Sequence, residues 1–547
     1  MIRPLIEYWR DQNFWSTLSG SLLTLLFMWV AYTAVGMVDK FVLTPMRMKR
    51  VMNSQGLKGP PVNWLLGNMP DRLRLESAES EKIMKTGDYD IMPHVLPFYT
   101  RSCQAYGKTH FWWLGWEARI VITELDLVKE IFANKNGSYE KSQIQLRFQS
   151  QLLGKGLVTT NGEEWVTHRQ TVAPAFHHEK IKVMVAAMAK SASSMADEWE
   201  TKVMDGGGCV ELEVGDYMTR LAANIIAHTA FGSNYERGRK VFDQQLALIN
   251  LYGQRAMQPL VAIPGYSLLP TPLNIQIFET QTAISNSLRE IIQSRKDMVN
   301  KTKKSSYGDD LLGLMLTTTS EKNTSRVEKA QFDMQALIDN CRTFFFAGHG
   351  ASSTFLTWTM MLLASHMNWQ ELAREEIKQV CGHGDCLLDA NMLNKLKIVN
   401  MILNETLRLF PPFVALTRQA MKDVKLGVWD IPKGLSLHIP ILAIHHDPNI
   451  WGPDVNEFKP ERFANGVAKA NKHPLAFMPF SFGQRFCVGQ GFTLVEAKCV
   501  LVVVLQRFRF HLSPNYRHAP HHNITLKAKY GVPVMLECLS MPNQSQG

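Results

Sequence analysis

The sequence has no closely spaced cysteine pair. Its eight cysteines are scattered over 547 residues, and none forms a Cys-x-x-Cys pair. This pattern argues against a disulfide scaffold or a zinc site and favours a reducing compartment. The chain also lacks a basic run of the kind that binds nucleic acid, although its formal net charge is +10. We therefore expect no nucleic-acid partner, and the basic balance points to an anionic membrane surface or an acidic protein partner.

Charged residues are absent from one long stretch near the N-terminus. None occurs from Gln12 to Val38, and residues 18–38 alone are long enough for a helix that spans a bilayer. Lysines and arginines follow, which orients the C-terminal bulk toward the cytoplasm. A cleaved signal peptide is the alternative, but the apolar run is long and no clear small-x-small cleavage site follows it. We expect a lumenal N-terminus over residues 1–11 and a transmembrane anchor over residues 12–38.

The segment after the apolar stretch has a different composition. Residues 39–68 contain a cluster of basic residues and the sequence Gly59-Pro-Pro61. Two prolines fix an extended, stiff backbone. We expect a basic and proline-rich linker here, which acts as a rigid spacer between the membrane and a domain over residues 69–547. At the end of that domain, residues 524–537 alternate weakly and predict a hairpin around Gly531.

A tight loop with glycines precedes an apolar run near the C-terminus. The loop reads Phe480-Ser-Phe-Gly483-Gln-Arg485-Phe-Cys487-Val-Gly489, and residues 492–505 predict a buried helix. Backbone N–H groups before a helix can stabilise a thiolate, and glycines let the backbone turn sharply and approach a flat ligand. A cysteine thiolate is one of the few axial ligands of haem iron. A lone cysteine before a helix is more often a buried free thiol. The spacing of the whole loop therefore has to decide between a free thiol and a haem ligand.

The loop matches the pattern Phe-x-x-Gly-x-Arg-x-Cys-x-Gly at every fixed position. On this ground the chain resembles the cytochrome P450 superfamily of haem-thiolate monooxygenases. The resemblance implies a mainly α-helical fold with a smaller β region, and a bound haem b. It also implies that Cys487 is the proximal iron ligand and that Arg485 pairs with a haem propionate. Phe480, Gly483 and Gly489 would complete the cofactor-binding loop.

Three more residues match positions that bind haem propionates in this family. Trp165 and Arg169 are four residues apart and share one face of a predicted helix. Alone, such a spacing is usually a surface cation–π pair, but in the family it places both side chains on a propionate. Arg418 matches a third propionate-binding position.

Residues 331–366 form one apolar stretch without proline, which predicts a long helix. Within it, Ala347, Gly348 and Ser352 match the family pattern Ala-Gly-x-acid-Thr-Thr/Ser, and we take these three as catalytic candidates. A glycine inside a helix costs about 1 kcal/mol relative to alanine. Close approach of a ligand would offset that cost, and close helix packing is the alternative explanation.

Two positions depart from the family pattern in this helix. Gly350 stands at the position of the acid, and Ala351 stands at the position of the threonine. In the family these two side chains help to carry protons to the bound dioxygen. Ser352 is rotated by about 100° around the helix, so it could substitute only in part. His349 is a second possible relay, although a structural histidine is the simpler interpretation.

Two later motifs are typical of the scaffold of the same family. Glu405 and Arg408 form a Glu-x-x-Arg pair, which by itself is usually a solvated ion pair. In the family they build a buried charge network with Arg462, and this network fixes the loop that carries the cysteine. After two prolines, the family places the chain over the distal haem face. The substrate-contact candidates are therefore Phe413, Val414, Ala415 and Leu416.

The resemblance also implies partners and a location. NADPH-cytochrome reductase would dock on the basic proximal side and deliver electrons, while one atom of dioxygen enters a small hydrophobic substrate. The protein would sit in the endoplasmic reticulum membrane with a single span and a cytoplasmic haem-thiolate domain. Segments such as Trp112-Trp-Leu-Gly115-Trp and Lys155-Gly-Leu-Val158 are similar to plant members of the branch with cytokinin hydroxylases and terpenoid or hormone oxidases. The substrate would then be isoprenoid-derived, hormone-like or fatty.

The missing acid and threonine leave two other functions open. One is a haem-thiolate isomerase or dehydratase that acts on an already oxygenated substrate. The other is a haem-containing protein that binds a ligand without turnover.

Overall fold

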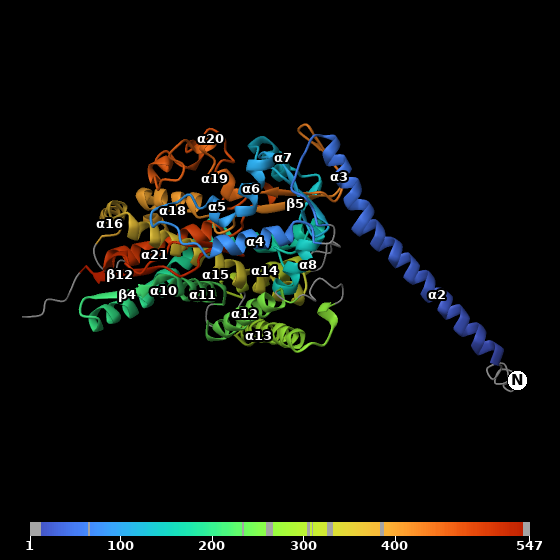
Figure 1. Ribbon diagram of the computed structural model, residues 1–547. Coiled ribbons are helices and arrows are strands. Elements are labelled where there is room, and N and C mark those ends of the chain that lie inside the picture. Colours follow the sequence, from blue (N-terminus) through green and yellow to red (C-terminus); the bar gives the residue numbers. More distant parts are fainter. Residues whose placement is uncertain are drawn as a thin grey trace, which may run out of the picture.

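The computed structural model describes residues 12–63, 66–231, 235–256, 258, 266–302, 307–308, 310–324, 332–382 and 388–539. One long helix leads away from a body of helices and small sheets (Figure 1). This helix, α2 (Gln12–Val38), continues through a short π-helix, η1 (Asp39–Leu43), into α3 (Thr44–Ser54). Its described part from residue 20 has a window of mean hydropathy 1.8 and is not buried against the body. By length and composition it could cross a membrane.

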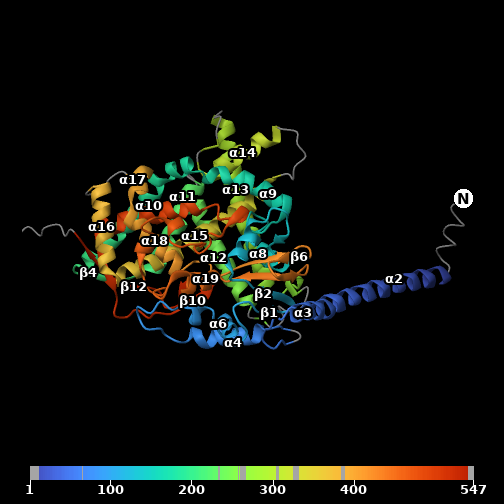
Figure 2. The same cartoon turned by 90° about the horizontal axis from the view of Figure 1, so that it is seen from above.

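The junction between this helix and the body lies at the turn between β1 and β2 (Figure 2). Phe41 and Trp116 meet edge to face there, with ring centroids 4.7 Å apart. Met52 is buried in a core cluster of the adjacent sheet, and Phe111 donates its backbone N–H to the carbonyl of Lys58 at 3.1 Å. The described end of the predicted linker therefore packs on the body and does not act as a free spacer.

Helices make up most of the body. They are α4 (Met69–Ser80), α5 (Met92–Val95), α6 (Pro97–Tyr106), α7 (Leu125–Ala133), α8 (Gln143–Leu153), α9 (Gly162–Val172), α10 (His178–Asp205), α11 (Val214–Phe231), α12 (Tyr235–Ala256), α13 (Pro272–Thr302), α14 (Leu311–Thr324), α15 (Met334–Ser365), α16 (Met367–Cys381), α17 (Ala390–Lys395), α18 (Lys397–Leu409), α19 (Ile441–His445), α20 (Pro448–Trp451) and α21 (Gln490–Arg507). Short 3-10 turns add η2 (Ala173–Phe176), η5 (Tyr266–Leu268), η6 (Pro460–Phe463), η7 (Val467–Lys469) and η8 (Gly483–Arg485).

Four small sheets complete the described fold. The largest has the order β1-β2-β8-β5-β3, and only its β2–β8 pair is parallel. A second sheet has the order β4-β12-β9, and two hairpins pair β6 with β7 and β10 with β11. The strands are β1 (Phe111–Leu114), β2 (Glu117–Val121), β3 (Tyr139–Glu140), β4 (Cys209–Glu213), β5 (Leu416–Ala420), β6 (Val424–Leu426), β7 (Trp429–Ile431), β8 (Ser436–Ile439), β9 (Phe508–Leu512), β10 (Pro520–Asn523), β11 (Thr525–Ala528) and β12 (Pro533–Cys538).

The predicted C-terminal hairpin is wrong. The strands on either side of Gly531 do not pair with each other, because β11 pairs with β10 and β12 pairs with β9 and β4. The alternation does mark two strands, but these two strands pair with other strands and not with each other.

The predicted long helix is confirmed as α15, which runs through the core. The Asp333 carboxylate caps its start by accepting the N–H of Ala336 at 2.7 Å. The helix contacts α11, α16, α18 and α21, and most of its side chains are buried. The predicted buried helix after the cysteine loop is confirmed as α21. A helix buried on all sides is a rigid frame, so α15 and α21 position the residues between them.

Candidate active site

Cys487 lies in a short loop between η8 and α21. Its N–H donates to the carbonyl of Phe480 at 2.9 Å, which closes the loop. Protein groups surround the thiol, although the residue as a whole keeps exposed surface. Burial raises the pKa of the thiol, while the N–H groups of Gly489 and Gln490 and the charge of Arg169 act in the opposite direction. The loop therefore aims donors at the sulfur, as predicted.

The glycines of the loop have different roles. Gly483 has φ 73°, and a Cβ there would lie 1.9 Å from the backbone oxygen of Phe132. Only glycine fits this turn without moving backbone. Gly489 has φ −87°, and a Cβ there would make ordinary contacts. The sharp turn therefore depends on Gly483, with Ser481 also held at a positive φ of 64°.

Two side chains of helix α9 contact the cysteine loop. The guanidinium of Arg485 lies over the ring of Trp165 at 4.3 Å. Arg169 donates to the carbonyl of Phe486 at 3.0 Å and lies over the Phe486 ring at 4.5 Å. The two helix residues thus bind the loop and do not form a surface pair with each other.

Further charged groups gather on the other side of Arg485. Arg485 pairs with Glu140 at 2.5 Å and donates to the carbonyl of Thr160 at 2.9 Å. Arg418 on β5 is buried, and burial and the charge of Arg485 lower its pKa to about 10. Lys141 is half-buried, and the charges of Arg418 and Arg485 both act on it. The sequence analysis missed Glu140 and Lys141, because only the pairing of β3 with β5 brings them to Arg418.

The middle of α15 is more open than its ends. Residues 346, 347, 348, 350 and 351 keep partial exposure, while the residues before and after them are buried. A Cβ on Gly350 would meet nothing within 4 Å. A Cβ on Gly348 would lie 3.1 Å from two carbons of Ile226 on α11, so close helix packing accounts for this glycine. Ala347, Gly350 and Ala351 share one helix face, which borders open space.

Ser352 does not face this open side. Its hydroxyl is buried and donates to the carboxyl oxygen Oε2 of Glu496 on α21 at 2.6 Å. Ser352 is therefore poorly placed to replace the missing threonine, contrary to the partial substitution that the sequence suggested. His349 is also buried, stacks edge to face on Phe242 at 4.7 Å, and contacts the carbonyl of Phe345. Burial lowers the pKa of His349 to about 4, so it is neutral at pH 7 and structural.

Glu496 gives the first testable prediction. Burial raises its pKa to about 8, and only the Ser352 hydroxyl opposes this. The unfolded chain ionises near 4.5, so the wild type loses stability as the pH rises from about 4.5 to 8. We expect Glu496→Gln to remove this loss. The thermal midpoint of the variant should exceed that of the wild type by a margin that grows from pH 5 to pH 8, whereas Ser352→Ala should show no such growth.

A buried ion network stands behind the cysteine loop. Glu405 and Arg408 on α18 have no exposed surface and pair at 2.7 Å, and Arg462 lies 3.5 Å from the same carboxylate. Arg408 donates to the carbonyl of His445 at 3.0 Å, and the His445 ring accepts the N–H of Met478 at 3.1 Å. Burial lowers the pKa of His445 to about 3.

The same chain of bonds reaches the loop itself. The carbonyl of Met478 accepts the N–H of Ser481 at 3.1 Å. Ser481 is the residue at positive φ that precedes Gly483. The three charged residues therefore hold the entrance of the cysteine loop through His445 and Met478, which agrees with the role that the family pattern implied.

The four substrate-contact candidates are not equivalent. Phe413 is 38% exposed, and Ala415 and Leu416 are half-buried, so these three have free surface. Val414 is 1% exposed and belongs to the main core, where its carbonyl accepts the N–H of Leu442 at 3.0 Å. We therefore remove Val414 from the candidates, because its side chain is part of the main core.

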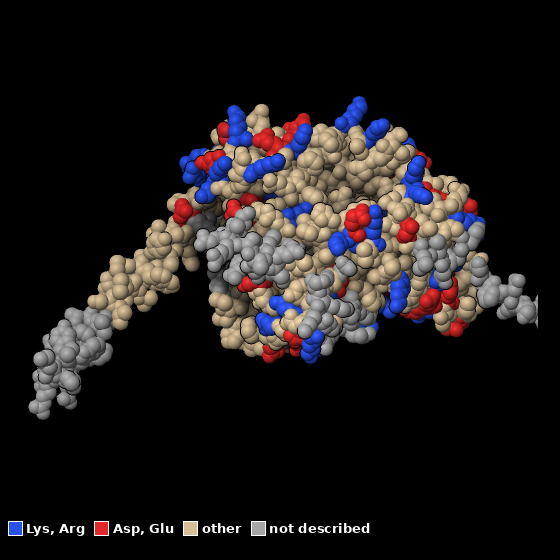
Figure 3. Space-filling view, turned by 180° about the vertical axis from the view of Figure 1, so that it is seen from behind, with Lys and Arg blue, Asp and Glu red and all other residues tan. Residues whose placement is uncertain are grey.

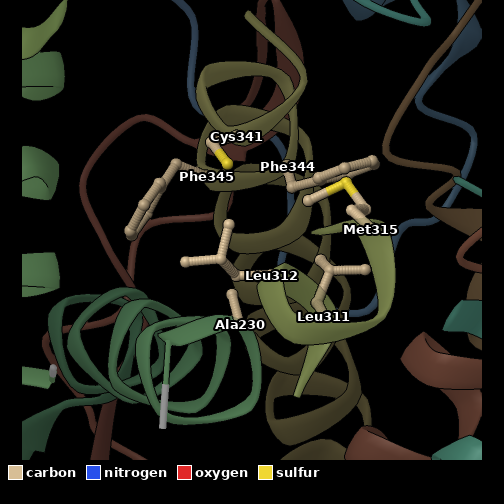
Figure 4. A pocket seen from close by; sticks show the side chains of 7 residues that line it. All are labelled: Ala230, Leu311, Leu312, Met315, Cys341, Phe344 and Phe345. Carbon is tan, nitrogen blue, oxygen red and sulfur yellow. The ribbon is translucent and has the colours of Figure 1, made fainter. Parts of the chain in front are cut away.

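A narrow apolar crevice lies elsewhere, between α11, α14 and α15 (Figure 4). The side chains around it are Ala230, Leu311, Leu312, Met315, Cys341, Phe344 and Phe345. It has no room for a water-sized molecule and no charged group. It is a packing gap next to the site and not a substrate pocket.

Comparisons with known proteins agree with this fold and loop. The family model described as cytochrome P450 matches residues 89–530. A cytokinin hydroxylase of Arabidopsis thaliana is 40% identical over 92% of this chain and 94% of its own. Cytochrome P450 709B1 of the same plant is 40% identical over 90% and 94% of the two chains. Cytochrome P450 CYP72A616 of Paris polyphylla is 38% identical over 96% of this chain and its own full length.

A mostly helical fold with a cysteine in a glycine-bearing loop before a buried helix is compatible with a haem-thiolate protein. The chain belongs to the cytochrome P450 family, whose members are oxidoreductases that bind haem b through a cysteine thiolate. Its residues fit that group. Cys487 has donors aimed at its sulfur and keeps exposed surface. Arg418 and Arg485 supply buried cations for the carboxylates of the porphyrin.

Proposed function

We propose that this protein is a membrane-anchored monooxygenase that hydroxylates a small hydrophobic substrate. The observation that carries the proposal is the Cys487 loop, with N–H groups directed at the sulfur and a ring of cations beside it. A haem held there by the thiolate supplies the chemistry that inserts one atom of dioxygen into a C–H bond. Relatives of the chain include cytokinin hydroxylases.

The protein residues hold the reactants in place and exclude water. Cys487 binds the iron, and Trp165, Arg169, Arg418 and Arg485 orient the porphyrin. Phe413, Ala415 and Leu416 form an apolar wall with free surface, and the face of Ala347, Gly350 and Ala351 supplies a second wall without a charged group. Both walls favour an apolar substrate, because a charged group would be left there without a partner.

The electron source and location belong to the same proposal. NADPH-cytochrome reductase would deliver the electrons from the basic proximal side, since an acidic partner is attracted by a net charge of +10. Helix α2 would anchor the chain in the endoplasmic reticulum membrane with the haem domain in the cytoplasm. Figure 3 shows no Lys, Arg, Asp or Glu on the described part of this helix before its junction with the body. The absence of charged side chains supports insertion of the helix into a membrane.

Reconstitution tests this function directly. The full chain in lipid vesicles with NADPH-cytochrome reductase would be offered a panel of cytokinin-like, terpenoid and fatty compounds, because relatives include cytokinin hydroxylases. Compounds that shift the Soret band are then assayed for products. We expect a product heavier by one oxygen atom, formed only with NADPH and dioxygen. Shifts of the Soret band without any product under these conditions would contradict the monooxygenase and indicate a protein that binds a ligand without turnover.

A second function is favoured by one specific observation. Gly350 and Ala351 carry no proton donor, and the Ser352 hydroxyl is already bound to Glu496. An isomerase or dehydratase that rearranges an oxygenated substrate has no need of that proton path. A product formed from such a substrate without NADPH or dioxygen would support this alternative and contradict the monooxygenase.

The missing proton donors give a second prediction. Restoring them with Gly350→Glu and Ala351→Thr should raise the fraction of NADPH that ends in hydroxylated product. Space exists for the new side chain, because nothing lies within 4 Å of a Cβ at Gly350. A well-placed general acid contributes about 10²–10⁴-fold to a proton transfer. We therefore expect the ratio of hydroxylated product to hydrogen peroxide, the by-product of uncoupled turnover, to rise about tenfold. The control is Gly350→Gln with Ala351→Val, which has similar volume. An equal gain in the control would exclude a proton relay.

A further inference from the structure

The first half of α15 carries buried polar side chains that bind the chain between α8 and α9. Asn340 is 0% exposed, and its amide oxygen accepts the N–H of Leu157 at 3.0 Å. The Asp339 carboxylate accepts the N–H of Lys155 at 2.9 Å in the same way. Buried polar groups are normally hydrogen-bonded, and here the bonds fix the backbone that leads into α9.

Asn340 also contacts α9 directly. Its amide nitrogen lies 3.0 Å from Nδ1 of His168, which is 4% exposed. On α9, His168 is next to Arg169 and three residues after Trp165, the two side chains that contact the cysteine loop. The period of the helix points His168 about 60–100° away from them. One face of α9 therefore contacts the cysteine loop, and a neighbouring face contacts α15.

The amide of Asn340 has one orientation that suits all its neighbours. Its oxygen accepts from Leu157, and its nitrogen donates to the carbonyl of Ala336 at 2.7 Å. The remaining N–H faces Nδ1 of His168, so this ring nitrogen is the acceptor. The ring is then neutral and carries its proton on Nε2, because a protonated ring would set two N–H groups against each other.

We propose that Asn340 and His168 form a clamp that positions α9 on the cysteine loop, and that the clamp opens when His168 is protonated. The pair acts through Trp165 and Arg169, so both members are positioning residues for the haem site. The inference rests on Cys487 as the iron ligand, because the loop that α9 contacts is the loop that carries this cysteine.

The surroundings of His168 set the direction of the pH effect. Burial lowers its pKa below the usual 6.5, and Asp333 is the charged group among the described residues that opposes this. The Asn340 amide would favour a protonated ring only through its oxygen, which already accepts from Leu157. The neighbouring ring of Phe332, with centroids 5.2 Å apart, has no charge. A released His168 ionises near pH 6.5, so the closed clamp is stable above that pH and loses stability as the pH falls below it.

Loss of the thiolate bond in the intact protein tests the proposal. The full-length holoprotein in lipid nanodiscs is incubated from pH 5.5 to pH 7.5, and the carbon monoxide band of a thiolate-bound haem is followed with time. His168→Asn keeps an oxygen that accepts from Asn340 at every pH, whereas His168→Leu never has an acceptor. Effects of pH on Cys487 are common to all these proteins and cancel in ratios of rates. His366→Asn is the control, because this half-buried histidine lies at the far end of α15.

The expected ratios differ in their pH dependence. The rate of band loss of the wild type relative to His168→Asn should be near one at pH 7.5 and rise to about tenfold at pH 5.5, in line with one proton in the linkage. His168→Leu should lose the band faster than His168→Asn by a factor that does not change with pH, and His366→Asn should behave as the wild type. A wild-type ratio that stays constant would overturn the opening by protonation, and equal rates for the two His168 variants would overturn the clamp.

Hydrogen exchange gives a second readout that needs no haem band. Exchange of the α9 amides, followed by mass spectrometry, should be faster in the wild type than in His168→Asn at pH 5.5 and equal in the two proteins at pH 7.5. Both proteins are compared at the same pH, so the intrinsic exchange rates cancel. A folded wild type without the thiolate band at pH 7.5 would contradict Cys487 as the ligand and not the clamp. Equal exchange in the two proteins at pH 5.5 would overturn the clamp itself.

Discussion

Replacement of Cys487 by serine should abolish the carbon monoxide band of a thiolate-bound haem and all turnover. A serine hydroxyl is not ionised at neutral pH, whereas the thiolate is the ligand form of cysteine. The N–H groups of Gly489 and Gln490 and the charge of Arg169 favour an anion at this position. We expect activity to fall by more than about 10³-fold, because the electron donation of the thiolate has no substitute.

Cys499 provides the matched control for this experiment. It lies twelve residues later on α21, is 0% exposed, and burial raises the pKa of its thiol to about 12. It therefore behaves as a small apolar side chain. Cys499→Ala should keep the haem band and lose only stability, at about 1–2 kcal/mol for a small cavity. A folded Cys487→Ser protein that retained the thiolate band would refute the assignment of the ligand, and with it the proposed function.

The second large effect should come from the ion network behind the loop. Glu405 and Arg408 have no exposed surface in the wild type. Glu405→Gln therefore leaves the Arg408 charge buried without its carboxylate partner. Loss of one member of a buried pair costs about 3–5 kcal/mol, which is a large part of the 5–15 kcal/mol that holds a typical domain together. We expect haem-poor protein with a thermal midpoint several degrees lower.

An exposed pair of the same spacing serves as the comparison. Asp71 and Arg74 on α4 are also three residues apart, at 3.2 Å, but their side chains are 49% and 71% exposed. Asp71→Asn should change stability by less than about 1 kcal/mol. The two variants are to be compared by haem content and by the midpoint of loss of the carbon monoxide band on heating. Equal effects at Glu405 and Asp71 would contradict the role of the buried network in holding the loop.

Local patterns predicted several elements correctly. The long helix was visible as an apolar stretch without proline, and α15 has nearly the predicted bounds. The loop of Cys487 was visible because a turn at a positive φ needs glycine, and Gly483 provides it. Such features depend on residues close together in the chain, so the sequence displays them directly.

Other expectations failed where the partner is distant in sequence. The strands beside Gly531 alternate as a hairpin would, but β11 pairs with β10, which directly precedes it, and β12 pairs with the more distant β9 and β4. Ser352 matched the family pattern, yet its hydroxyl is used by Glu496, which lies 144 residues away. Val414 sits among exposed neighbours but points into the core.

The sequence by itself determined the family, the candidate ligand cysteine and the presence of an apolar N-terminal helix, since each depends on a contiguous motif or run. Only the tertiary structure decided which side chains are buried and which charged groups lie beside one another. Arg418 is the clearest case, because burial on β5 and the charge of Arg485 from the cysteine loop together lower its pKa to about 10. Burial and charge balance are properties of the folded neighbourhood, and no single segment carries them.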